Sequence, residues 1–151
     1  MSTPDSQKTI VFDLDATAAE YHGWDVHGKF PGPPRPDFIR NVCRLREHGK
    51  HIGILSTRPD AIVHKWIAKY ALGALIDFVG ASPWQPPNAG YKPIAFCYID
   101  DRAIRYDGHN MDEIVDGILS GTMVPWYKKL RTEKEIQDRQ ASNRGFAEAS
   151  G

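Results

Sequence analysis

Four carboxylates of this sequence stand directly after apolar, β-branched stretches that are typical of buried strands. Asp13 and Asp15 follow the stretch 9–12, and Asp100 and Asp101 follow a second such stretch. Acids this close together repel each other unless a cation lies among them. Hard carboxylate oxygens suit Mg²⁺, which keeps several waters and shares its remaining positions with a phosphate oxygen. The acids therefore predict a magnesium site in which one carboxylate is free to act as a nucleophile.

Hydroxyl and cationic side chains stand at comparable places in the sequence. Ser56, Thr57 and Arg58 occupy the end of the apolar stretch 51–56 and the positions after it, and Lys92 stands shortly before the stretch that leads to the second acid pair. Ligands of an open parallel sheet bind beyond the carboxyl ends of its strands. If the strands are parallel, all these side chains converge with the acids on one edge of the sheet.

Structural roles compete with these chemical ones. The first pair of acids can cap the end of its strand, and Asp101 can form a local ion pair with Arg102. Ser56 and Thr57 can cap the helix that follows them, which is compatible with a role in binding. Arg58 can contact a substrate anion or be an ordinary surface charge. Lys92, taken by itself, would be interpreted as a solvated loop residue. Only its position shortly before the apolar stretch that leads to Asp100 and Asp101 favours a function.

The elements that must position these residues alternate along the chain. Strands are expected at 9–12, 51–56, 75–79 and 94–99, and helices at 37–49, 59–73 and 111–121. Asn110 is expected to cap the last helix and Gly121 to end it. The strands are too apolar for burial on one side only, which predicts a Rossmann-like α/β fold with a parallel sheet flanked by helices.

Composition is consistent with one globular domain. The 151 residues are 41% hydrophobic, and the net charge of +0 gives no global attraction to nucleic acid or membranes. We expect a flexible N-terminus (1–8), one domain (9–130) and a polar tail (131–151). The sequence contains no apolar run near the roughly 20 residues of a membrane span, and its polar start predicts no secretory leader. Two cysteines inside apolar segments are typical of reduced core residues, which predicts a cytoplasmic protein.

The sequence resembles the haloacid dehalogenase (HAD) superfamily of phosphohydrolases over about residues 9–120. "VFDLDAT" is similar to the first motif of that family, D-x-D-G-T after a hydrophobic strand, and "ILSTR" is similar to the second. Lys92 in "GYKPIAFCYIDD" occupies the place of the third motif, and "YIDDRAIRYDG" is similar to the fourth. The sequence of residues 85–108 especially resembles that of small HAD phosphatases without a cap domain.

The resemblance implies a role for each acid. Asp13 would attack phosphorus and form an aspartyl-phosphate, which divides one difficult displacement into two. Asp15 would protonate the leaving oxygen and then take a proton from the hydrolytic water, with its backbone carbonyl on the metal. Mg²⁺ would be held by Asp13 and Asp100, and Asp101 would bind it through water or orient the motif lysine.

The resemblance also implies the phosphate-binding groups. Ser56 would donate a hydrogen bond to a phosphoryl oxygen, and the amide of Thr57 would assist it. Lys92 would neutralise the phosphate and keep Asp13 ionised. Arg58 is the further candidate for contact with the substrate anion.

One residue departs from the family pattern. The usual glycine after the second acid is Ala16 here, followed by the expected Thr17. If this site needs a positive φ, the loop is shifted and the chain could be a catalytically impaired HAD-fold binding or regulatory module. If the site is helical or extended, the extra methyl is harmless, and this is what we expect.

The intervals between the motifs predict the type of substrate. Residues 18–36 are too few for a folded cap, and residues 59–91 are taken up by a helix, a strand and a loop. Tyr21 and Trp24 would then line the entrance of a site covered by a flap only. An open site suits a large phosphorylated substrate such as a protein, a nucleic-acid end or a glycan, and the sequence does not choose among these. The oligomeric state is equally undetermined by the sequence.

Overall fold

The computed structural model describes residues 6–21 and 30–125. The chain divides into two compact units, Met1–Asp100 and Asp101–Gly151, which are described separately below. Among the described residues, no helix has the length and apolar character needed to cross a membrane. The predicted extent of a single domain, 9–130, stays a prediction.

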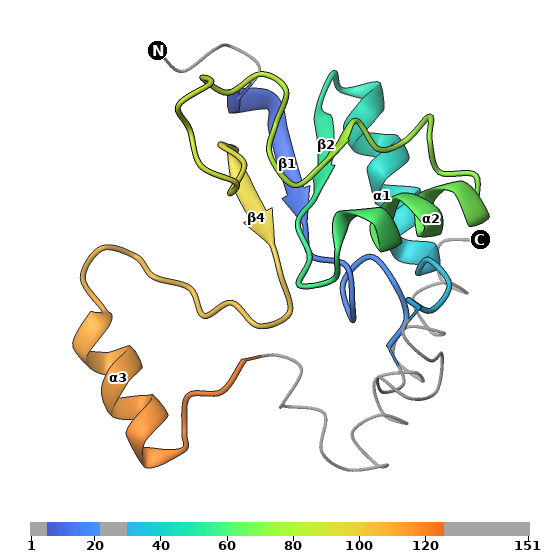
Figure 1. The fold of residues 1–151 in the computed structure, drawn as a ribbon. Helices are drawn as coiled ribbons and strands as arrows, with labels where there is room; N and C mark the ends of the chain where they lie inside the picture. Colours follow the sequence, from blue (N-terminus) through green and yellow to red (C-terminus); the bar gives the residue numbers. More distant parts are fainter. Residues whose placement is uncertain (1–5, 22–29, 126–151) are drawn as a thin grey trace. The chain divides into compact units, whose positions relative to one another are not determined.

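A four-stranded sheet forms the centre of the first unit (Figure 1). Its strand order is β3-β2-β1-β4, and every neighbouring pair is parallel. The strands are β1 (Thr9–Phe12), β2 (His51–Ile54), β3 (Phe78–Val79) and β4 (Cys97–Ile99). The predicted parallel α/β fold is therefore confirmed, with β1 between β2 and β4.

The helices begin close to their predicted positions. They are α1 (Pro36–Glu47), α2 (Asp60–Lys69) and α3 (Met111–Ser120), with a short 3-10 turn at Ser6–Lys8. The predicted helix 59–73 ends early because Ala71 adopts a left-handed backbone with φ of 54°. Gly49 takes φ of 76° just after α1, which agrees with its predicted role as a helix stop.

The core of the first unit lies between the sheet and its two helices. Alternate residues of β1 and β2 share this face and are buried, among them Phe12 and Ile54. From α1, Phe38 places its ring edge-on against Phe12, with 5.0 Å between the ring centroids. From α2, Trp66 is fully buried, and its indole Nε1 donates a 2.7 Å hydrogen bond to the carbonyl of Gly32. The burial of these side chains fixes the ends of β1 and β2.

The loop after β3 covers part of the other face of the sheet. The ring of Trp84 in this loop packs at a tilt of 40° against His51 of β2, with 4.4 Å between the ring centroids. It also lies edge-on to the ring of Phe78, with 5.8 Å between the centroids. A Cβ on Gly53 would overlap the Phe78 ring, so only glycine fits at this position of β2. The ring of Phe78 thus takes the space of the missing side chain.

Two predicted strands are shorter and more exposed than expected. Only Phe78–Val79 of the predicted strand 75–79 pairs with β2, because the amides of Leu75 and Ile76 bond to the carbonyl of Leu72 in a turn. In β4, Tyr98 and Ile99 are each 42% exposed. The expectation of burial on both faces holds for β1 and is wrong for β4.

The second unit contains α3. Ile114 is the buried residue of this helix, and Gly121 ends the helix in a left-handed conformation with φ of 78°, as predicted. Asn110 makes no side-chain cap bond. Instead its Oδ1 accepts a hydrogen bond from the amide of Asp107 and its Nδ2 donates to the carbonyl of Arg105. Asn110 is thus the N-cap residue of α3 by position, as predicted, but its side chain does not cap the helix.

Candidate functional site

The backbone on both sides of β1 continues the sheet hydrogen bonds past the strand. The amide of Asp13 donates to the carbonyl of Ile99 at 2.9 Å, and the amide of Leu55 donates to the carbonyl of Phe12 at 3.0 Å. Asp13 therefore leaves the sheet at a fixed point between its two neighbouring strands. The carboxyl ends of β1, β2 and β4 lie at one edge, as a parallel sheet requires.

Three of the predicted acids meet at this edge. One carboxylate oxygen from each of Asp13, Asp100 and Asp101 lies within 4.8 Å of the others. Asp101 is buried, Asp13 is half-buried and Asp100 is exposed. Oxygens on opposite sides of an octahedral Mg²⁺ are about 4 Å apart, given metal–oxygen distances of roughly 2.0–2.1 Å. The donor set and its spacing thus fit a small divalent cation after minor side-chain adjustment.

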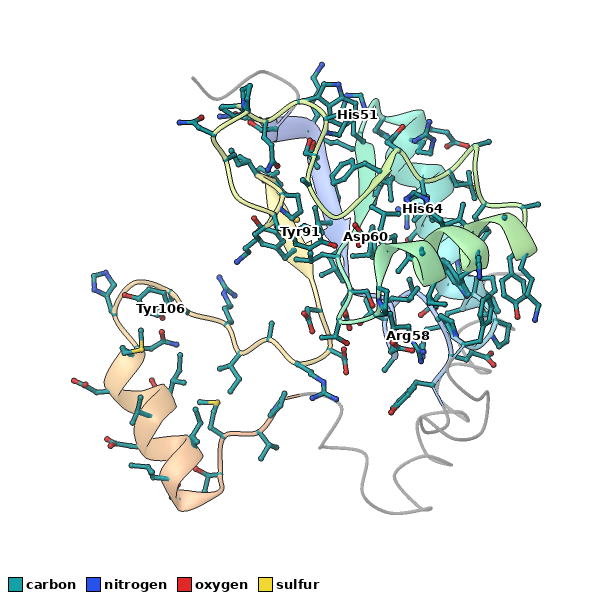
Figure 2. All side chains as sticks on the ribbon, in the orientation of Figure 1. His51, Arg58, Asp60, His64, Tyr91 and Tyr106 are labelled. Carbon is teal, nitrogen blue, oxygen red and sulfur yellow. The ribbon has the colours of Figure 1, made fainter. Side chains whose placement is uncertain are left out.

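Asp15 faces a different partner from these three acids. Its two carboxylate oxygens accept hydrogen bonds from Arg58, at 2.7 Å from Nε and 2.9 Å from Nη2. Arg58, labelled in Figure 2, lies in the turn after β2. It is only 4% exposed, so its interpretation as an ordinary surface charge is wrong. The sequence could not have revealed this pair, because the partners are 43 residues apart and no local pattern joins them.

The turn after Asp13 is closed by short backbone bonds. The amide of Ala16 donates to the carbonyl of Ala19 at 3.0 Å, and the amide of Ala19 donates back to Leu14 at 2.8 Å. Within this turn Ala16 has φ of 65°. The expectation of a helical or extended backbone at Ala16 is therefore wrong. The turn requires a left-handed residue, which costs an L-amino acid about 1–2 kcal/mol.

The hydroxyl of Ser56 belongs to the turn that follows β2. Its Oγ accepts a hydrogen bond from the amide of Arg58 at 3.0 Å. The helix α2 begins at Asp60 without a side-chain cap bond, so helix capping by Ser56 or Thr57 is wrong. Thr57 is exposed at the tip of this turn. A phosphate contact from either residue stays a prediction.

Lys92 lies beside β4. Its Nζ stands 4.6 Å from the centroid of the Tyr98 ring, a cation–π contact. The Tyr98 hydroxyl in turn donates a 2.6 Å hydrogen bond to the carbonyl of Pro93. Tyr98 precedes Asp100 by two residues, so the lysine is held near the strand that carries the acid. Its predicted role toward phosphate remains untested.

A tyrosine that was not predicted as a site residue fixes the loop that carries Lys92. The Tyr91 hydroxyl donates a hydrogen bond to Asp60 at the start of α2 (Figure 2). This bond, aided by burial and by the negative charge of Asp60, raises the pKa of Tyr91 to about 12. The Tyr91 ring also covers Gly80, where an added Cβ would come within 2.7 Å of it. The loop that carries Lys92 is thus tied to α2.

A partly open pocket of about 610 Å³, lined by both apolar and polar side chains, lies on the α1 side of β1 and β4. Its wall includes Phe12, Phe38, Leu45 and Ile99, and Thr17 of the turn after Asp15 borders it. No sequence pattern pointed to this pocket. Of the predicted entrance residues, Tyr21 is 40% exposed. Trp24 and the tail 131–151 lie outside the described residues.

The comparisons with known proteins bear on the fold. No family model matches the chain, and no curated protein matches it. Among solved structures, the chain is similar to a conserved protein of Bacteroides thetaiotaomicron, with a TM-score of 0.53 and 18% sequence identity. The match covers 78% of this chain and 93% of that one. At this identity the similarity supports a shared α/β fold.

Proposed function

We propose that this chain is a Mg²⁺-dependent phosphatase of the HAD type, which hydrolyses a phosphate monoester through an aspartyl-phosphate. The observation that carries the proposal is the meeting of Asp13, Asp100 and Asp101 at the carboxyl edge of a parallel sheet. Asp15 stands two residues after Asp13 but lies outside this cluster, so its carboxylate is not among the candidate cation ligands and is the group that we assign to proton transfer. The proposed nucleophile and acid–base group therefore both lie on the segment after β1. The other two acids of the proposed cation site follow the neighbouring strand β4.

The proposed reaction has two steps. In the first, a carboxylate oxygen of Asp13 bonds to phosphorus while the bond to the ester oxygen breaks, and Asp15 gives that oxygen a proton. In the second, water bonds to phosphorus and the bond to Asp13 breaks, while Asp15 takes the proton of the water. The products are the alcohol and inorganic phosphate, and both aspartates return to their starting states.

Charge compensation completes the proposal. Asp13, Asp100 and Asp101 would hold Mg²⁺, which would supply positive charge to the phosphate oxygens when bound. Ser56 and the Thr57 amide would donate to the phosphoryl oxygens. Lys92, on the loop fastened by Tyr91, would balance the remaining negative charge.

The substrate class follows from what surrounds the motifs. Between α2 and β4 the structure has only β3 and loops, which leaves no folded cap in that interval. We therefore propose a large phosphorylated substrate, such as a protein, a nucleic-acid end or a glycan. A cytoplasmic location agrees with Cys43 and Cys97, which form no disulfide.

The test is hydrolysis of a panel of phosphate esters by the purified chain with and without Mg²⁺. Turnover should require Mg²⁺ and should fall by several orders of magnitude in Asp13→Asn, because an amide cannot form the acyl phosphate. Asp116→Asn, an exposed acid on α3, is the matched control and should retain activity. A phosphate label found on any residue other than Asp13 would overturn the assignment.

A catalytically impaired binding or regulatory module is the second candidate. It is favoured by Ala16, which occupies a left-handed position with φ of 65° where the family pattern has glycine. This candidate expects Mg²⁺ binding without turnover of any ester in the panel. The same experiment therefore separates the two functions.

A further inference from the structure

Arg58 is a buried cation, two of whose donors bind one carboxylate. Its side chain is 2% exposed, whereas the side chain of Asp15 is 18% exposed. The Nε and Nη2 donors bind the two oxygens of Asp15 at 2.7 and 2.9 Å. This is the two-point geometry in which a planar guanidinium fixes both the place and the rotation of a carboxylate.

The backbone of Arg58 is fixed as well. Its amide donates to the hydroxyl of Ser56 in the turn after β2. The turn of Asp15, for its part, is closed by the bonds around Ala16 and Ala19. The ion pair therefore joins two turns that follow neighbouring strands of the sheet.

The buried position of Arg58 argues against direct contact with a substrate. An incoming phosphate would have to displace Asp15 to reach the Nε and Nη2 donors. Asp15 has two oxygens with about four acceptor positions, and the bonds to Arg58 use two of them. The remaining positions, on the more exposed partner, can face a leaving oxygen or a water.

We propose that Arg58 is a positioning residue that holds Asp15 in the orientation needed for proton transfer, and that it does not bind the substrate phosphate. This inference rests on the proposed phosphatase function for the role of Asp15. It replaces the sequence-based expectation that Arg58 contacts the substrate anion. Arg58 is thus expected to affect the reaction only through Asp15.

Nuclear magnetic resonance tests the two-point contact between Arg58 and Asp15, called the clamp below, without any substrate. The Nε–H proton of Arg58 should exchange slowly with water and give a separate signal in the wild-type protein. Asp15→Asn should shift this signal or remove it by fast exchange, whereas Asp13→Asn should leave it in place. A signal that is unchanged in Asp15→Asn would overturn the clamp, whatever the activity of the protein.

Kinetics distinguish positioning from substrate binding. Arg58→Lys keeps the positive charge but loses the planar pair of donors that binds both oxygens of Asp15. We therefore expect kcat/KM to fall about 100-fold for an alkyl phosphate, whose leaving oxygen needs a proton. It should fall far less for p-nitrophenyl phosphate, whose leaving group departs without one. Inhibition by inorganic phosphate should keep its Ki within a factor of about two, because a positioning role leaves the phosphate subsite unchanged.

A double variant completes the experiment. If Arg58 acts through Asp15, Arg58→Lys should cost little further activity in an Asp15→Asn background. Equal losses for both esters, a raised Ki for phosphate, or additive losses in the double variant would overturn the positioning role. An inactive wild type would instead contradict the proposed phosphatase, and the resonance experiment would still decide whether the clamp exists.

Discussion

Ala16 has a backbone conformation that is unfavourable for a residue with a side chain. Its φ of 65° lies in the left-handed region that favours glycine. Ala16→Gly should relieve about 1–2 kcal/mol of strain and add about 0.4–1 kcal/mol of freedom to the unfolded chain. We expect a net stabilisation of roughly 0.5–1 kcal/mol by these two terms, measured by chemical denaturation.

Ala71 provides a matched control for this substitution. It also has a positive φ, 54°, but it lies after α2 and away from the acids. Ala71→Gly should stabilise the fold by a similar amount and leave catalysis unchanged. If Ala16→Gly instead lowers the stability, the left-handed turn after Asp15 is not the conformation in solution.

Tyr91 gives a prediction at alkaline pH. Its hydrogen bond to Asp60 raises its pKa in the folded state from the ordinary value of 10.0 to about 12. A pKa raised on folding contributes stability that is complete below about pH 10 and is lost as the pH rises through about 12. Tyr91→Phe should lose up to about 1 kcal/mol at neutral pH, the worth of one exposed hydrogen bond.

The measurement is urea unfolding of both proteins from pH 8 to pH 12. The difference between them should shrink as the pH approaches the folded pKa of about 12. Tyr106→Phe, another exposed tyrosine, serves as the control, and its difference from the wild type should not follow this course. A constant difference for Tyr91→Phe would show that its hydroxyl is not bound to Asp60.

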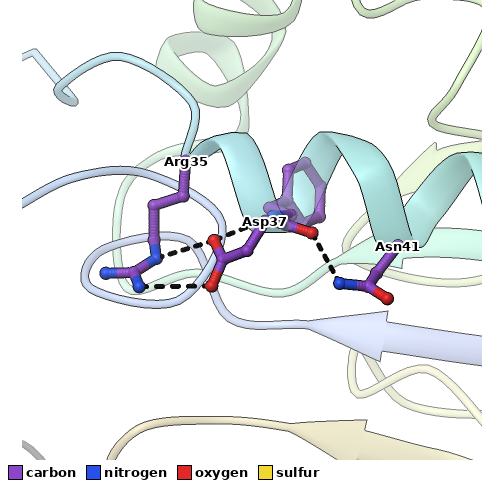
Figure 3. Close-up of polar contacts among 4 residues, drawn as sticks. Arg35, Asp37 and Asn41 are labelled. Atoms are coloured by element: carbon purple, nitrogen blue, oxygen red, sulfur yellow. Dashed lines mark hydrogen bonds and ion pairs between the residues drawn. The ribbon is translucent and has the colours of Figure 1, made fainter. Parts of the chain in front are cut away.

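At the scale of elements, the start of α1 depends on Asp37. Its carboxylate accepts hydrogen bonds from Arg35 at 3.1 and 3.3 Å and from the amide of Phe38 at 2.9 Å, while its carbonyl accepts from Asn41 (Figure 3). Burial opposes ionisation, but the hydrogen bonds and charges of Arg35, the Phe38 amide and the charge of Arg40 outweigh it. The pKa of Asp37 is therefore lowered.

This lowered pKa fixes the pH at which Asp37 matters. Its stabilisation is present above the ordinary value of 3.8 and is lost as the pH falls through the lower folded pKa. Asp37→Asn should cost about 0.3–1 kcal/mol at pH 7, since an acid in the first helical turn also meets the helix dipole. Melting temperatures measured at pH 7 and then at successively lower pH should show the difference and its decline below the ordinary value of 3.8. Glu47→Gln, at the opposite end of α1, should not destabilise the protein.

The existence of the elements could be predicted from the sequence better than their ends. The strand at 9–12 was predicted with its observed bounds, because its buried β-branched run is followed at once by acids. The run 75–79 is also mostly apolar but is interrupted by Asp77, and Ile76 is buried from a turn, since an apolar pattern predicts burial and not conformation. Among the site residues, Asp13 and Asp100 were predicted to converge and do so. The pairing of Asp15 with Arg58 depends on tertiary structure and was missed.

For the whole molecule, the acid cluster predicts that a divalent cation stabilises the fold. Mg²⁺ would bind the assembled carboxylates and not the unfolded chain, so it should raise the melting temperature. At a concentration 100 times Kd the gain in unfolding free energy is about 2.7 kcal/mol. Differential scanning calorimetry with Mg²⁺ and with EDTA measures it. Asp100→Asn should abolish the effect and Asp116→Asn should keep it; an effect that survives in Asp100→Asn would place the cation elsewhere.

The sheet bonds around Asp13 also determine how long the candidate nucleophile stays in place. The amide of Asp13 bonds at 2.9 Å to Ile99 of β4, the exposed edge strand, whereas the amide of Leu55 bonds at 3.0 Å to Phe12 of the buried strand β1. Amides between buried strands exchange with deuterium only when the core opens, whereas amides at an exposed edge can exchange through local fluctuations. The amide of Asp13 should therefore exchange faster than the amide of Leu55. On heating, the bond between Asp13 and β4 should open before the bond between β1 and Leu55 is lost in the melting transition.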